Sequence, residues 1–354
     1  NNALLTMKSA ALNLSLSSTF LARTVSSSDE SVFTATVADG TAVQSTSVIV
    51  DRIATNSTFM SAGAASEDAI VYVPTSQEST TGVAALTSVV DADGGNLVIT
   101  YGATPATITV AVPVGTKLED AADQANSLVH LINSDAENAG KVTASSFLKD
   151  GEYYLRIETA TAGGTGEANR VKITTNTTDL TLSPPAKTFA INVGDETMVL
   201  SVAGDTTISQ LVDLINDDTD NPGVTASIID DGTASPYKLV LKADSTGEEQ
   251  EITMLAQLPD LAMALAGEVG SDLNARITID GVSYQRQTNT VSDVLSGITL
   301  TLKSADTAPV SVANKDAAIK EMVVGSSSNF LDMVVVEIPE AEFVITLKNM
   351  AIVR

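Results

Sequence analysis

The sequence predicts a strand-rich α+β protein in which two tandem similar modules are inserted in a base domain built from both chain ends. Each module is expected to contain a strand pair, one helix and a second strand pair. The pattern Leu-Val-x-Leu-Ile-Asn at 128–133 returns at 211–216. Alternating apolar and polar residues, typical of half-buried strands, surround both copies. Further alternating segments lie at the two ends of the chain, and the simplest topology folds them together.

The second copy begins and ends with predicted strands. Residues 197–202 place Met198, Leu200 and Val202 on one face, the period of a half-buried strand, and the pair Gly204-Asp205 that follows is typical of a turn. Two more alternating segments come after the repeated pattern, near 224–229 and 238–242. The interval between the two copies, from residue 128 to residue 211, is too long for a solenoid unit. It indicates that each copy belongs to a small domain with its own core.

A short helix is expected between these strand pairs, over 207–216. Thr206 or Thr207 can cap its first turn, with Gln210 close to the capping-box position. Asn216 stands where the helix ends. Apolar residues recur at i, i+3 and i+4, which predicts one buried helix face; they are Leu211, Leu214 and Ile215.

The first copy carries the same motif within a longer apolar pattern. Leu128 and Ile132 take the places of two buried positions of the second copy, and Asn133 takes the place of the terminal asparagine. Because apolar residues already recur from Leu118, the spacing predicts a longer helix here, over 118–132.

The base domain is expected to combine both chain ends. Strands are predicted at 32–37 and 47–51, and again at 275–279 and 298–302, with Asp280-Gly281 as a tight turn. A helix with an apolar stripe is expected at 3–14, and a capped turn or short helix at 289–294. The expected boundaries are 1–75 and 266–324 for the base, 76–180 and 181–265 for the modules, and 325–354 for an unrecognised strand-like tail.

Composition excludes several classes of protein. The net charge of −25 argues against nucleic acid as a partner, because that affinity rests largely on Lys and Arg. The same charge should keep free copies of the chain apart, and salt should relieve this repulsion. The absence of cysteine removes disulfides and thiolate sites. No apolar run is long enough to cross a membrane, and a start without Met or a basic segment suggests a fragment.

Catalytic constellations are nearly absent. The single histidine, His130, has Asp213 as its counterpart in the second copy, which indicates a solvated helix position rather than a general base. Gly163-Gly-Thr-Gly166 lacks the Lys-Ser/Thr ending of a phosphate loop and is expected to form a hairpin turn. Two acidic segments, 91–96 and 216–221, faintly resemble calcium loops but lack the twelve-residue spacing, so solvated turns are expected. No catalytic residue, metal or cofactor is predicted.

Three blocks in a fixed order resemble the bacterial flagellar filament cap family, also called hook-associated protein 2. The region around Phe33-Thr-Ala-Thr-Val37 and Val48–Ala54 resembles the opening part of that family. Asn274–Gly281 and Gly297–Lys303 resemble the segment that re-enters after its distal domains. Phe189-Ala-Ile-Asn192 with the second copy of the repeat resembles the IN motif shared by flagellins and hook-associated proteins. The resemblance covers about residues 1–323.

The resemblance implies a structural role and no covalent chemistry. Members of the family form a ring-shaped homo-oligomer at the tip of the extracellular filament, where emerging flagellin subunits fold into place. Flagellin, the filament tip, further copies of the chain and an export chaperone are the implied partners. A host mucin or surface is a further one, since distal modules are adhesive in some members. The alternative is a secreted tandem-module surface adhesin.

The family pattern is not complete in this sequence. The extreme terminal segments, which are disordered or coiled-coil helices in the family, are missing. Residues 317–323 are similar to the start of the returning helix, and the sequence then turns to two strand-like stretches at 333–338 and 343–347.

Overall fold

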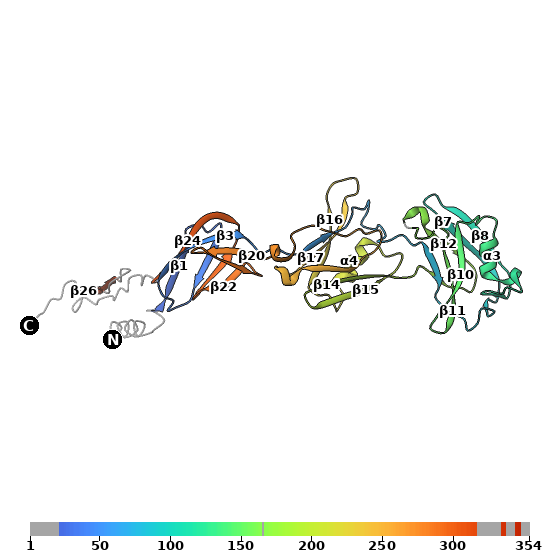
Figure 1. Ribbon diagram of the computed structural model, residues 1–354, viewed down its shortest axis with the longest axis horizontal. Helices are drawn as coiled ribbons and strands as arrows, with labels where there is room; N and C mark the ends of the chain where they lie inside the picture. The colour runs from blue at the N-terminus through green and yellow to red at the C-terminus, as the bar shows by residue number, and fades with distance from the viewer. Residues whose placement is uncertain (1–20, 165, 317–333, 338–343, 348–354) are drawn as a thin grey trace, which may run out of the picture. The chain divides into compact units, whose positions relative to one another are not determined.

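The computed structural model describes residues 21–164, 166–316, 334–337 and 344–347. Within these ranges the chain is rich in strands and contains two α-helices, α3 and α4 (Figure 1). The helix expected at 3–14 and the segment 317–323 lie outside the described residues. The chain divides into two compact units.

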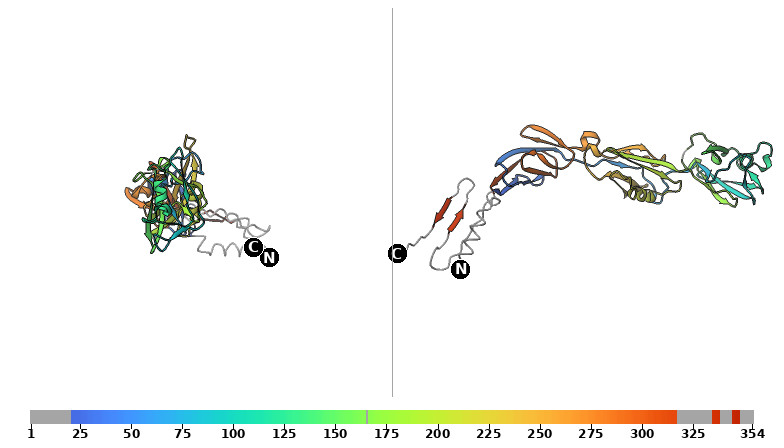
Figure 2. Two further views of the ribbon diagram at one scale, coloured as in Figure 1. Left: turned by 90° about the vertical axis from the view of Figure 1, so that its right-hand side faces the viewer. Right: turned by 90° about the horizontal axis from the view of Figure 1, so that it is seen from below.

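The first unit combines segments that are far apart in the sequence, residues 21–56, 245–249 and 268–316. Its five-stranded sheet has the order β1-β24-β3-β20-β21, and its three-stranded sheet the order β2-β23-β22. Figure 2 shows blue strands from the start of the chain beside orange strands from its end. The strands are β1 (Arg23–Ser27), β2 (Phe33–Val37), β3 (Gln44–Arg52), β20 (Ala275–Ile279), β21 (Val282–Arg286), β22 (Thr290–Leu295), β23 (Ile298–Leu302) and β24 (Asp306–Asp316).

One apolar core lies between these two sheets. Phe33, Val50 and Leu300 are completely buried in it and come from both ends of the chain. The tight turn between β20 and β21 is confirmed. Asp280 and Gly281 have φ angles of 47° and 85°, and the left-handed backbone at both central positions is what a two-residue hairpin requires.

The turn or short helix expected at 289–294 is wrong, because these residues form strand β22. Val291 pairs with Leu300 of β23 and is buried in the core, as is Leu295. Pairing with β23 and burial of Val291 and Leu295 therefore override the local capping pattern.

The second unit contains two sets of sheets, each with one helix. In the set that includes the second copy of the repeat, the sheet orders are β15-β14-β18 and β16-β17-β4-β19. α4 lies between β15 and β16 in the chain. The bounds are β4 (Thr58–Met60), β14 (Lys187–Val193), β15 (Glu196–Val202), α4 (Ile208–Asn216), β16 (Val224–Asp230), β17 (Tyr237–Ala243), β18 (Ile252–Ala256) and β19 (Ala264–Leu265).

The set that includes the first copy of the repeat has the sheet orders β12-β7-β8 and β10-β11-β5-β13, with α3 between β8 and β10 in the chain. A short pair, β6 with β9, precedes the helix. The bounds are β5 (Ser76–Ser79), β6 (Val89–Asp91), β7 (Gly95–Tyr101), β8 (Ala106–Val112), β9 (Thr116–Lys117), α3 (Leu128–Ser134), β10 (Val142–Lys149), β11 (Glu152–Thr159), β12 (Val171–Asn176) and β13 (Leu182–Ser183).

Each set encloses its own buried cluster, one around α3 and one around α4. Residues 57–75, which the sequence analysis groups with the N-terminal segment, belong to the second unit. The reason is β4, which pairs with β17 and β19 although it precedes the whole first set in the chain. The first set therefore lies between β4 and the rest of the second set's sequence.

Two further segments complete the description. The glycine-rich segment at 163–166 does not form a hairpin turn, because β11 pairs with β10 and β5 whereas β12 pairs with β7. The segment instead connects strands of two different sheets. In the tail, β25 (Val334–Glu337) pairs with β26 (Val344–Leu347), as the strand-like pattern there predicts.

Candidate functional site

The helix α4 begins with a complete capping box. The Thr207 hydroxyl accepts a hydrogen bond from the N–H of Gln210, and the Gln210 side chain accepts one from the N–H of Thr207. Two of the unpaired N–H groups at the helix start are thereby satisfied. This confirms the cap predicted from the sequence and assigns it to Thr207.

The buried face of α4 differs from the expected one at a single position. Leu211 and Ile215 are completely buried, and Ile208 joins them, whereas Leu214 is 42% exposed. At about 100° per residue, the three buried side chains fall within about 60° of one another around the helix axis. Leu214 lies about 60° beyond Leu211 on the same scale, so the prediction that it is buried is wrong.

Asn216 ties the end of α4 to the following strand. Its Nδ2 donates to the carbonyl of Ala226 at 2.9 Å, and its Oδ1 accepts from the N–H of Ala226 at 2.8 Å. Asn221 makes a second connection nearby. Its Nδ2 donates to the carbonyls of Ile215 and Val224, both at 2.8 Å, while its Oδ1 accepts from the N–H of Val224.

The first copy repeats both connections. Asn133 exchanges hydrogen bonds with Ala144, at 2.8 Å and 2.7 Å. Asn138 is buried and donates to the carbonyls of Ile132 and Val142, while accepting from the N–H of Val142. In each copy the first asparagine thus joins the helix end to the strand, and the second supplies a donor to a carbonyl at the helix C-terminus, Ile132 or Ile215. We call the four residues Asn133, Asn138, Asn216 and Asn221 the asparagine anchors.

The helix of the first copy is shorter than predicted. α3 spans Leu128–Ser134, and the expected helix over 118–132 is wrong in its first half. Asp120 accepts from the N–H groups of Ala122 and Asp123 and forms an ion pair with Lys117 at 2.6 Å. Aspartate side chains that bond nearby backbone groups favour turns over helices, and this local bonding outweighs the apolar spacing. Leu128 and Ile132 are completely buried, as their motif positions suggest.

The histidine and the acidic loops show no catalytic or metal-binding arrangement. His130 is half-buried on α3, and its N–H approaches the capping hydroxyl of Ser127. Among the described residues, no group of three or more His, Cys, Asp or Glu side chains could hold a metal ion. In this part of the chain there is also no helix suited to crossing a membrane.

Asp91 is not the solvated residue expected of an acidic turn. The side chain is completely buried, with Oδ1 accepting from the N–H of Gly94 at 3.1 Å and Oδ2 lacking a partner. The second acidic segment is likewise structured, because its Asn216 and Asn221 serve as anchors.

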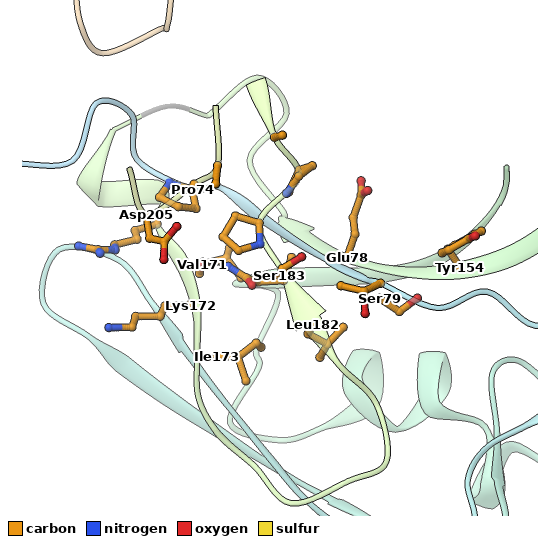
Figure 3. Close-up of a pocket in the computed structure, with 18 of the residues that line it drawn as sticks. Pro74, Glu78, Ser79, Tyr154, Val171, Lys172, Ile173, Leu182, Ser183 and Asp205 are labelled. Carbon is orange, nitrogen blue, oxygen red and sulfur yellow. Dashed lines mark hydrogen bonds between the residues drawn. The ribbon is translucent and has the colours of Figure 1, made fainter. Parts of the chain in front are cut away.

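A cavity in the second unit has a volume of about 770 Å³. Lys149, Arg170 and Lys172 line it together with Phe147 and Tyr154. Figure 3 shows Lys172 and Asp205 at one end of the cavity and Tyr154 at the other. A neighbouring tyrosine, Tyr72, donates to the carbonyl of Pro185 at 2.9 Å. Burial, and then the charge of Asp205, raise the pKa of Tyr72 to about 12, so it remains a hydrogen-bond donor at neutral pH.

An open groove follows the exposed side of α4. It has a volume of about 580 Å³, and Leu214 lies in it. Its charged residues are all acidic: Asp205, Asp213, Asp217 and Asp218. The cavity was not predicted from the sequence, because its walls come from segments that only the fold brings together. The groove was not predicted either, although all of its lining residues lie within the single segment 205–218.

Of the asparagine anchors, only Asn133 and Asn216 were singled out by sequence pattern. Asn138 and Asn221 were missed, although each stands five residues after its motif asparagine. That shared spacing is the signal that could have identified them.

Three family models match the chain. The model described as flagellar hook-associated protein 2 N-terminus matches residues 1–57, and the model described as its C-terminus matches 273–325. The model described as flagellin hook IN motif matches 188–245. The described parts of the two terminal matches lie largely in the first unit, and the third match contains α4 and the anchors Asn216 and Asn221.

Relatives with similar sequences carry the same description. The chain is 31% identical to the B-type flagellar hook-associated protein 2 of Pseudomonas aeruginosa over 38% of this chain and 34% of the relative. It is 34% identical to flagellar hook-associated protein 2 of Salmonella typhimurium over 34% of this chain and 27% of the relative. These alignments therefore span about a third of the length of those relatives.

Solved structures show a similar but more distant likeness. The D1-D2-D3 domains of the flagellar cap protein FliD from Escherichia coli align with 89% of this chain and 66% of that chain, at 18% identity and a TM-score of 0.42. The D2-D3 domains of FliD from Serratia marcescens align with 80% and 99% of the two chains, at 17% identity and a TM-score of 0.40.

Proposed function

Because this chain belongs to the flagellar hook-associated protein 2 family, we propose that it is a structural cap at the tip of the bacterial flagellar filament. In this role it promotes the folding and polymerisation of flagellin outside the cell and carries out no catalysis. The observation that carries the proposal is the match of both terminal family models, in the family's order, to segments that fold into one unit.

The proposed architecture is a base domain from both chain ends with two similar modules between them. The pairing of β3 with both β20 and β24 supports the base. The matching strand orders of the two sets, and the equivalent asparagine anchors, support two modules of one kind. The pairing of β4 with β17 supports a second module that also contains the segment from residue 57.

The motif residues serve this architecture rather than a reaction. Leu128, Ile132, Leu211 and Ile215 fill the two module cores, and Asn133 and Asn216 fix each helix to the neighbouring strand. A cap must withstand the emergence of flagellin beneath it, so rigid modules suit the proposed role. Flagellin, the filament tip and further copies of the chain are its proposed partners. The matches favour this cap over the surface adhesin.

A gene deletion tests the proposal. A strain that lacks the full-length protein should release flagellin monomers into the medium and grow no filaments, because an unfolded subunit diffuses away before it docks. The wild-type gene, and a gene carrying His130→Ala, should both restore filaments and motility. Normal filaments in the deletion strain would contradict the cap function. Loss of motility with a correctly folded His130→Ala protein would contradict the dismissal of this histidine.

A further inference from the structure

Positive charge is concentrated at one place on a strongly acidic chain. The sequence has 44 acidic and 19 basic residues, yet three basic residues, Lys149, Arg170 and Lys172, line one cavity in which the carboxylates are Glu78 and Asp205. Glu78 is already paired with Arg156, and Asp205 also lines the groove along α4. Arg170 forms an ion pair at 3.2 Å with Glu167, and Glu167 does not line the cavity. The described residues place no carboxylate within ion-pair distance of Lys149 or Lys172. The two ammonium groups are therefore available to an acidic partner.

A ladder of side chains on β10 and β11 positions one of these charges, the Lys149 ammonium. The Phe147 and Tyr154 rings stack with centroids 5.7 Å apart. The Arg156 guanidinium lies 4.5 Å from the Phe147 centroid, and the Lys149 ammonium lies 5.9 Å from that of Tyr154. Arg156 is fixed in turn by Glu78 at 2.7 Å. Each aromatic ring already contacts the other ring and one cation. A partner would therefore interact with the positive charge of the cations rather than with the rings.

The acidic groove along α4 has the opposite character. Asp205, Asp213, Asp217 and Asp218 line it, and no Lys or Arg does. The half-exposed Leu214 adds an apolar contact in the middle of these carboxylates. Four like charges in one groove repel each other, and a cationic surface would relieve that repulsion.

We propose that the cationic cavity of one copy of this chain receives the acidic α4 groove of a second copy. Both surfaces are present on every copy, so the contact can repeat from copy to copy. Lys149 and Lys172 then face Asp213 and Asp217, and Leu214 packs at the centre. Complementary charge of this kind favours encounter and sets which surfaces meet. The inference rests on the proposed function, since it names the surfaces through which the cap's subunits meet.

The contact reverses the salt dependence expected from composition. A net charge of −25 predicts repulsion that eases as salt rises. Complementary patches instead predict an association that weakens as the screening length falls from about 10 Å at 0.1 M to about 3 Å at 1 M salt.

Sedimentation velocity of the full chain tests the proposal by charge reversal. The wild type should self-associate at low salt. Lys149→Glu with Lys172→Glu should weaken this association by about tenfold or more, and so should Asp213→Lys with Asp217→Lys. An equimolar mixture of the two variants should recover it, because each then offers the surface that the other needs. Lys242→Glu with Arg276→Glu, which makes the same change in net charge on exposed positions elsewhere, should leave it unchanged.

Several results would overturn the contact. These are a wild type that stays monomeric at every salt concentration, a lysine-reversed variant that associates normally, a control that weakens equally, or a mixture that does not recover. A variant that binds flagellin less but self-associates normally would assign the cavity to flagellin instead. Circular dichroism checks folding, and the milder pair Lys149→Gln and Lys172→Gln should give a smaller change of the same sign. The deletion strain tests the cap function separately, so the two failures are distinguishable.

Discussion

Asn216 and Ala226 form a two-way hydrogen-bonded pair in which the amide side chain replaces a neighbouring backbone. Nδ2 donates to the Ala226 carbonyl at 2.9 Å and Oδ1 accepts from its N–H at 2.8 Å. Asn133 does the same with Ala144 in the first set. An exposed asparagine at the end of a short helix thus joins helix to sheet, which explains its presence in both copies of the motif.

We expect Asn216→Ala to destabilise its module by about 1–3 kcal/mol, since two backbone groups of Ala226 lose their partner. Asn133→Ala should have a similar effect on the first module. Urea unfolding measures both changes. Thr219→Ala, an exposed substitution just beyond the helix, is the control and should change stability by less than about 0.5 kcal/mol. Equal midpoints for Asn216→Ala and the wild type would show that the anchor contributes nothing.

The corrected helix face predicts a contrast between neighbouring leucines. Leu211→Ala should cost about 2–5 kcal/mol, because it removes a completely buried side chain and leaves a cavity. Leu214→Ala should cost less than about 0.5 kcal/mol, since this side chain is exposed. Thermal or urea unfolding of the two variants measures both changes in stability. A similar loss of stability in both variants would mean that Leu214 is buried, as the sequence analysis expected.

Asp231 predicts an acid-dependent contribution to stability. Hydrogen bonding, first from Lys238 and then from Thr233, lowers its pKa from 3.8 to about 2. Because the folded pKa lies below the ordinary value, the contribution is present above about pH 4 and is lost as pH falls through about 2. In NMR titrations the Asp231 carboxyl should move toward its ordinary pKa in Lys238→Met. An unchanged midpoint in that variant would remove Lys238 as the cause.

His130 should be replaceable by the residue that its counterpart carries. His130→Asp places a carboxylate in the first turn of α3, where the helix dipole tolerates or favours negative charge. We expect stability within about 0.5 kcal/mol of the wild type and unchanged motility in the complemented strain. Asp213→His is the reciprocal substitution and should be equally mild. A loss above about 2 kcal/mol would reveal a packing role for the imidazole.

Local patterns predicted several strands correctly. A period of two identified β15, β16, β17, β20 and β23 within a few residues, because a strand with one buried face imposes that period on the chain. The capping box of α4 and the turn at Asp280-Gly281 were likewise predictable, since both depend on residues close together in sequence.

The errors at β22 and Leu214 arise from tertiary contacts, and the error before Leu128 arises from local hydrogen bonding. Residues 290–295 become a strand because β23 lies beside them, and the segment before Leu128 is not helical because Asp120 bonds its own backbone. Leu214 has the right spacing but lies beyond the surface that the sheet covers.

The sequence by itself determined the repeated motif, the strand-rich composition, the family resemblance and the sign of the net charge. Only the tertiary structure decided that β4 joins β17, that Asp91 is buried, and that Lys149 and Lys172 gather in one cavity. The reason is physical: period and capping depend on neighbours a few residues away, whereas burial and local charge depend on segments that meet only after the chain has folded.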